Sequence, residues 1–99
     1  MLNINKTIEG KKAILFAEGR LDTLTAPDLE KEIQSILPGL EELALDFEKL
    51  EYISSAGLRV LLSAQKVMNG QGKMTVCHVN ATVMEIFEVT GFSDILTIE

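Results

Sequence analysis

The sequence has 99 residues, of which 46% are hydrophobic, and it carries a formal net charge of −6. This length and composition predict a single domain over residues 1–99 with a core of its own, and they exclude a disordered segment. The negative charge argues against nucleic acid and against an anionic membrane surface as partners, because both are bound by basic faces.

The cellular setting follows from a few residues. Cys77 is the single cysteine, so no internal disulfide can form. Asn3, Asn5 and Lys6 interrupt the apolar residues near the first position, and we therefore expect no signal peptide. No stretch approaches the roughly 20 apolar residues that a membrane-spanning helix needs. These features predict a cytoplasmic protein without direct membrane insertion.

The first part of the sequence predicts a hairpin followed by a helix. Residues 2–8 alternate between apolar and polar, and a turn at 9–11 joins them to 13–17. The continuous apolar run at 13–17 predicts a strand covered on both faces, and the short turn makes the two strands antiparallel. Thr25 is the expected N-cap of the helix, which ends at residues 38–39, a Pro-Gly pair. The apolar stripe of this helix consists of Leu29, Ile33, Ile36 and Leu37.

Two further strand and helix pairs are expected after this helix. Residues 43–47 alternate as a strand does, and residues 48–51 are interpreted as a connection. A helix is predicted from about residue 56 to residue 69, and a fourth strand at 74–79 follows it.

The last part of the sequence predicts a third helix and a short edge strand. Asn80 is the expected N-cap of the helix, and Gly91 ends it. Residues 92–98 contain the apolar residues of the edge strand. The order β-β-α-β-α-β-α-β predicts an α/β fold with a mixed, mostly parallel sheet of about five strands.

A pair of serines, Ser54 and Ser55, lies where the strand pattern gives way to the helical one. Backbone N–H groups at a helix start have no partner within the helix, and the macrodipole makes that end partly positive. A serine hydroxyl there can cap the helix, and a phosphate there would be held by the same groups. The sequence leaves both interpretations open.

Other chemistry finds little support in the sequence. Cys77 and His78 are neighbours in the predicted fourth strand and should point to opposite faces, so we expect ordinary strand residues and no metal site. The serines lack a Gly-x-Ser-x-Gly setting, which makes a serine hydrolase remote. No phosphate-binding glycine loop is present, and no cofactor is expected.

Three motifs together carry a resemblance to a known family. They are the segment from Tyr52 to Leu58, the segment from Gly19 to Asp22 with the Thr-Ala-Pro at 25–27, and the segment from Val89 to Phe92. At this order and spacing, the sequence resembles a STAS domain of the bacterial anti-sigma factor antagonists over essentially its whole length.

The resemblance implies a regulatory binding protein, not an enzyme. Proteins of this type bind an anti-sigma factor, a serine kinase with a histidine-kinase-like fold, and so free a sigma factor for transcription. The kinase phosphorylates one serine of the antagonist and ends binding, and a serine phosphatase reverses the modification. Aligning the motif on Gly57 places the phosphorylated residue at Ser55. The implied partner-binding residues are Asp22, Ser54, Ala56, Gly57 and Arg59.

Several alternatives stay open at this point. The family usually has Asp where this sequence has Ser54, and Ser or Thr where it has Ala56, so Ser54 is the alternative phosphorylation site. A different branch of the family would be a scaffold that is never phosphorylated, such as an accessory subunit of a bacterial transporter or signalling assembly. Asp22 fits a partner surface or a turn carboxylate equally, and Arg59 fits a partner contact or a solvated surface.

Overall fold

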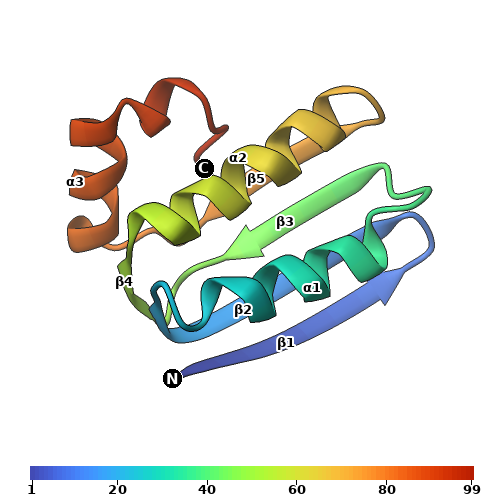
Figure 1. Ribbon diagram of the computed structural model, residues 1–99. Coiled ribbons are helices and arrows are strands. Elements are labelled where there is room, and N and C mark those ends of the chain that lie inside the picture. Colours follow the sequence, from blue (N-terminus) through green and yellow to red (C-terminus); the bar gives the residue numbers. More distant parts are fainter.

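Five strands form one sheet, and the helices α1 and α2 lie side by side across one of its faces (Figure 1). The computed structural model describes all 99 residues. The strands are β1 (Leu2–Glu9), β2 (Lys12–Leu21), β3 (Glu42–Asp46), β4 (Leu50–Ile53) and β5 (Lys73–Cys77). The helices are α1 (Ala26–Ile36), α2 (Ser55–Asn69) and α3 (Ala81–Thr90), followed by the 3₁₀ turn η1 (Phe92–Asp94).

The strands have the order β1-β2-β3-β5, and β4 also pairs with β2. Only the β1–β2 pair is antiparallel, while β2–β3, β2–β4 and β3–β5 are parallel. The predicted α/β fold with a mixed, mostly parallel sheet is confirmed. Strand β2 pairs first with β3 and then with β4, and its register shifts between Gly19 and Arg20 where it changes partner.

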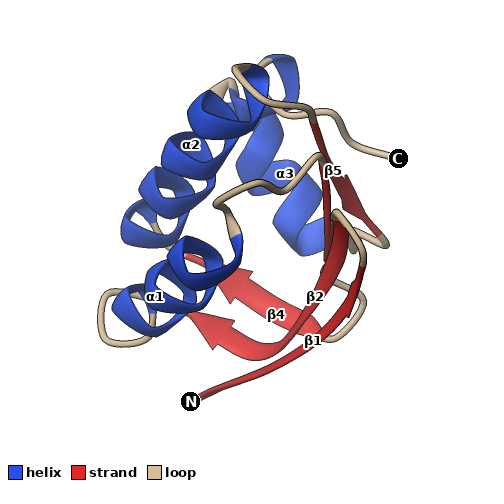
Figure 2. Ribbon diagram, turned by 90° about the vertical axis from the view of Figure 1, so that its right-hand side faces the viewer, coloured by secondary structure: helices blue, strands red, loops and turns tan.

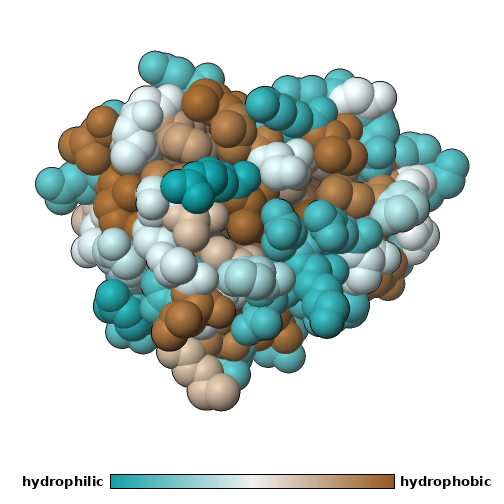
Figure 3. All heavy atoms as spheres, in the orientation of Figure 1, coloured by the Kyte–Doolittle hydropathy of each residue, from teal (hydrophilic) through white to brown (hydrophobic).

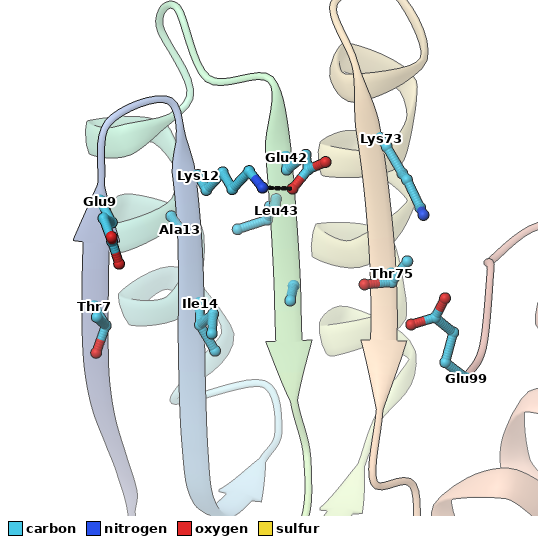
Figure 4. Close-up of a pocket in the computed structure, with 11 residues that line it drawn as sticks. Thr7, Glu9, Lys12, Ala13, Ile14, Glu42, Leu43, Lys73, Thr75 and Glu99 are labelled. Atoms are coloured by element: carbon cyan, nitrogen blue, oxygen red, sulfur yellow. Dashed lines mark ion pairs between the residues drawn. The ribbon is translucent and has the colours of Figure 1, made fainter.

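The prediction that residues 13–17 are covered on both faces is wrong. Ala13, Leu15 and Ala17 are buried, but Ile14 and Phe16 are each 39% exposed. The helices lie on one side of the sheet only, which leaves the other face open (Figure 2). Figure 4 looks onto part of this open face, where Lys12 and Glu42 pair across β2 and β3. An apolar run indicates a buried strand, yet it does not show how many faces are covered.

The prediction that residues 48–51 are a connection is wrong, because β4 begins at Leu50. Leu50 and Ile53 are both buried, and β4 lies parallel to the end of β2. Strand prediction depends on the alternation of buried and exposed residues. The four residues of β4 do not alternate, because their two buried residues are three positions apart.

The end of the chain also differs from its prediction. Residues 92–98 do not form an edge strand: η1 occupies their first part, and Ile98 makes a single parallel bridge to Val76. The third helix does begin and end where expected. Asn80 Oδ1 accepts a hydrogen bond from the backbone N–H of Val83 at 2.8 Å, and Gly91 adopts the left-handed conformation that commonly ends a helix.

The start of α2 approaches the sheet unusually closely at Gly57, which is buried. A Cβ atom at this position would lie 2.7 Å from Leu21 Cγ and 2.8 Å from Ile53 Cγ1. Both of those side chains are fully buried members of the core, so neither has room to move aside. The absence of a side chain at Gly57 therefore sets how α2 sits on the ends of β2 and β4.

Replacing this glycine tests the contact. We expect Gly57→Ala to lower the free energy of unfolding by about 1–2 kcal/mol, because overpacking costs about 1–3 kcal/mol and the better helix propensity of alanine returns at most about 1 kcal/mol. Urea denaturation measures the change. Gly70→Ala is the matched control, since a Cβ there meets only ordinary contact at 3.5 Å. Equal stabilities of the two variants would contradict the packing argument.

Candidate functional site

The ends of β2 and β4 bring together two of the three sequence motifs, the one that ends at Asp22 and the one that contains the two serines. Leu21 and Ile53 are partners in the parallel pairing, and the backbone N–H of Ser54 donates a hydrogen bond to the carbonyl of Leu21 at 2.8 Å. Asp22 and Ser54, the next residue of each strand, therefore emerge at the same edge of the sheet. Residues that lie 32 positions apart in the sequence begin one surface.

The two serines at the start of α2 have different roles in the structure. Ser54 is the N-cap, and its hydroxyl accepts a hydrogen bond from the backbone N–H of Gly57 at 3.5 Å, a long distance for such a bond. Its carbonyl accepts from the backbone N–H of Leu58 at 2.9 Å. Ser55 is the first residue of the helix, is exposed, and has a hydroxyl without a hydrogen-bond partner.

The electrostatic setting of Ser55 favours an anion. The first turn of α2 contains no acidic residue of its own that would offset the partial positive charge at the helix start. Arg59 is exposed, makes no ion pair, and lies four residues after Ser55. Residues four apart share one face of a helix, which places the guanidinium on the side of the helix where Ser55 lies.

A shallow hollow separates the starts of α1 and α2. It lies beside Ser54 and Ser55, which we call the serine loop. It is lined by Thr23, Ala26, Pro27, Glu30, Ala56, Arg59 and Val60. On the face of the molecule that carries these helices, hydrophobic side chains are exposed in several places among polar ones (Figure 3). Such a mixed, shallow surface suits contact with another protein better than enclosure of a small ligand.

Leu24 is a candidate contact residue that sequence reasoning missed. Its side chain is 86% exposed in the turn between β2 and α1, two residues after Asp22. An apolar residue between two threonines in a predicted turn was the available signal. A large exposed apolar side chain next to a candidate docking surface offers a partner apolar area to bury.

Asp22 serves the turn that leads into α1. Its Oδ1 accepts hydrogen bonds from the backbone N–H groups of Leu24 at 3.0 Å and Thr25 at 3.1 Å. Burial acts to raise the pKa of Asp22, but these bonds together hold the pKa of the carboxyl below its usual value. The hydrogen bonds show Asp22 as a turn carboxylate, and its place in a partner-binding surface stays a prediction.

The prediction of Thr25 as the N-cap residue of α1 is confirmed in position, although not in the hydrogen bond expected of a cap. Thr25 occupies the N-cap position, but its hydroxyl makes no capping hydrogen bond to the helix. The hydroxyl instead accepts from the backbone N–H of Asp22 at 2.9 Å and donates to the carbonyl of Arg20 at 2.8 Å. These bonds tie the turn back to the end of β2.

The expectation that Cys77 and His78 are both strand residues holds for Cys77 and is wrong for His78. Strand β5 ends at Cys77, and His78 lies beyond it with a φ of 58°, so the alternation of strand side chains does not apply. His78 Nδ1 lies 2.9 Å from Asp46 Oδ2. This hydrogen bond, together with the negative charge of Asp46, raises the pKa of His78, while burial and the same charge raise the pKa of the Cys77 thiol.

Comparison with known proteins identifies the family. The family model described as STAS domain matches residues 3–99. This chain belongs to the STAS family. The STAS protein BtrV of Bordetella bronchiseptica, named for a proposed role as an anti-sigma factor antagonist, is 37% identical over 87 residues, which cover 86% of this chain and 75% of that protein. An anti-sigma-B factor antagonist of Staphylococcus aureus is 28% identical over 97 residues, covering 96% of this chain and 90% of that protein.

Solved structures show the same fold. An anti-sigma factor antagonist from Mycobacterium paratuberculosis matches this STAS chain with a TM-score of 0.90 at 18% identity, covering 99% of this chain and 85% of that one. The Bacillus protein SpoIIAA in its phosphorylated form matches with a TM-score of 0.75 at 14% identity, covering 100% of this chain and 91% of that one. None of the helices in this chain combines the length and apolar character needed to cross a membrane.

The hydrogen bonds of Asp22 generate a pH-dependent prediction. We expect Asp22→Ala to lower the urea midpoint at neutral pH, whereas Asp22→Asn should retain most of the stability because an amide oxygen can accept the same two bonds. Since the folded pKa of Asp22 is lowered, its ionised form contributes stability above the unfolded pKa of 3.8, and this contribution is lost as pH falls through the folded pKa. The wild type should therefore lose stability relative to Asp22→Asn on acidification. Parallel pH curves for the two proteins would contradict this.

Proposed function

We propose that this STAS protein is an anti-sigma factor antagonist, and that phosphorylation of Ser55 ends its binding to an anti-sigma factor. The observation that carries the proposal is the division of roles at the start of α2. Ser54 caps the helix, and Ser55 presents a free, exposed hydroxyl at its first position. A kinase can reach this hydroxyl without disturbing the core.

The names of the relatives support the class of partner. The matching proteins of two bacterial species are named as antagonists of anti-sigma factors, and one of these names specifies an anti-sigma-B factor. The partner in this proposal is accordingly an anti-sigma factor that is also a serine kinase, and a serine phosphatase removes the phosphate. The protein acts by binding and catalyses no reaction of its own.

The fold tolerates the modification in this proposal. Phosphorylation adds about −1.5 to −2 charges, and a negative charge at a helix start is stabilised by roughly 0.3–1 kcal/mol. Neither an acidic side chain nor a packed neighbour opposes it in the first turn of α2. A phosphorylated SpoIIAA structure that shares this fold agrees with that expectation.

The loss of binding arises at the interface. A partner that packs against Ser55, Ala56 and the adjoining hollow removes the hydroxyl of Ser55 from water. A phosphate on Ser55 would then lose its hydration at the interface, or would face a carboxylate of the partner, at a cost of several kcal/mol. Because about 1.4 kcal/mol corresponds to a tenfold change in affinity, such a cost is enough to release the partner.

Ser55 is a better acceptor than Ser54 on structural grounds. The hydroxyl of Ser54 already accepts from the backbone N–H of Gly57, and its side chain is only partly exposed. Phosphorylating Ser54 would rearrange the cap, whereas phosphorylating Ser55 leaves the cap in place. The absence of the family's usual Asp at position 54 then changes the cap residue and not the acceptor.

Binding of variants tests this proposal. We expect Ser55→Ala to bind the anti-sigma factor of the same organism as tightly as the wild type, and Ser55→Asp to bind at least about tenfold more weakly, because the carboxylate must be desolvated at the interface. Calorimetry measures both. Ser35→Asp, an exposed serine near the end of α1, is the control for added charge. Equal affinities for Ser55→Ala and Ser55→Asp would remove Ser55 from the mechanism.

A kinase assay separates the two serines and the scaffold alternative. Incubation with the same anti-sigma factor and ATP should modify the wild type and Ser54→Ala but not Ser55→Ala, as mapped by peptide mass spectrometry. Phosphate found on Ser54 alone would show that Ser54, and not Ser55, is the residue that the kinase modifies. Tight binding without any phosphate on either serine would favour the scaffold role.

A further inference from the structure

The ends of β3 and β5 bring a second group of reactive side chains together. Asp46 and Cys77 are the last residues of β3 and β5 and are partners in the parallel pairing. Their neighbours Leu45 and Val76 are fully buried. Because side chains alternate along a strand, Asp46 and Cys77 both point to the open face of the sheet.

His78 joins these two residues through its backbone conformation. An extended residue after Cys77 would send its side chain to the opposite face, but the φ of 58° turns the imidazole back toward Asp46. This left-handed conformation is uncommon outside glycine, although histidine is among the residues enriched in it. One ligand atom from each of Asp46, Cys77 and His78 lies within 4.8 Å of the other two.

We propose that Asp46, Cys77 and His78 form a binding site for a divalent zinc-class cation. Zn²⁺ is commonly held by a combination of thiolate, imidazole and carboxylate, whereas Ca²⁺ and Mg²⁺ prefer oxygen alone. A thiolate and a carboxylate supply two negative charges, which match the charge of the cation. Binding transfers the thiol proton of Cys77 to solvent as the sulfur–metal bond forms. His78 binds as the neutral imidazole through a ring nitrogen that carries no proton, so any proton on that nitrogen also leaves, and no electron is transferred.

The geometry needs only a small adjustment to accept the ion. Zinc bonds of about 2.0–2.3 Å in a tetrahedral arrangement place the ligand atoms roughly 3.5 Å apart. The donors must therefore approach each other by about 1.3 Å at most, and His78, whose side chain is 62% exposed, has room to turn toward the other two. Three protein ligands leave the fourth position to water.

Hydrogen bonds around Asp46 orient its carboxylate toward His78. Its Oδ1 accepts a hydrogen bond from the backbone N–H of Glu48 at 3.0 Å, while Oδ2 faces His78. The backbone N–H of Phe47 donates to the carbonyl of Cys77 at 3.0 Å and keeps the two strand ends in register. Hydrogen bonds of this kind orient the ligands of metal sites. The site shares no residue with the serine loop, so its presence does not depend on the proposed function.

Metal titration of the whole chain, reduced and free of any affinity tag, tests the site. We expect one Co²⁺ to bind per chain with a sulfur-to-cobalt charge-transfer band and the intense visible bands of tetrahedral cobalt. Zn²⁺ should displace it and raise the melting temperature. Cys77→Ser should remove the charge-transfer band, and Asp46→Asn and His78→Asn should each weaken Zn²⁺ binding by about tenfold or more in calorimetry. Asparagine is chosen at position 78 because it tolerates the left-handed backbone.

The control is Glu99→Gln, which removes a nearby negative charge that is not a proposed ligand. We expect it to bind Zn²⁺ almost as the wild type does. Circular dichroism and unfolding of each metal-free variant show whether it is folded, and His78→Asn, at an exposed position, tests the site even where Cys77→Ser is unstable. A cobalt complex without a charge-transfer band, or Zn²⁺ affinity that is equal in the wild type, Cys77→Ser and His78→Asn, would overturn the proposal.

Discussion

The contact of Gly57 with Leu21 and Ile53 is the constraint on which the serine loop depends. Because this residue has no side chain, the first turn of α2 rests directly on the paired ends of β2 and β4. The hydrogen bond from Ser54 to the carbonyl of Leu21 fixes the same junction from the loop side. One residue, Ser54, separates β4 from α2, so the position of the next hydroxyl is set by two packed elements and not by a flexible loop.

Such a junction explains how neighbouring serines can differ in role. The N-cap position needs an oxygen that points back at the helix, and Ser54 supplies it with an extended backbone. The following residue already has helical geometry, which turns the side chain of Ser55 outward into solvent. Stability therefore depends on the first hydroxyl, whereas the second is free for recognition. A charge added at Ser55 changes what the surface can bind far more than it changes the folding of the chain.

Local signals account for what the sequence could predict. Asn80 and Gly91 mark the ends of α3 because each satisfies backbone groups within a few residues of itself. The helix α2 is also predicted from a local signal, the helical spacing of its apolar residues. Strand β4 was missed because Leu50 and Ile53 are held by pairing with distant β2, and a four-residue strand carries no period of its own. The open face beside β2 was missed because an apolar run does not show where the helices pack.

The group formed by Asp46, Cys77 and His78 shows the same limit at a site. Alternation correctly predicts the direction of Cys77, but one left-handed residue reverses the rule for His78, and no neighbouring glycine signals it. Asp46 reaches the group only through the register of β3 with β5, which the sequence does not display. Parallel strands end at a common edge, so residues just beyond their ends converge even when they are far apart in the chain. In this fold, the ends of β2 and β4 bring Asp22 close to Ser54, and the ends of β3 and β5 bring Asp46 close to His78.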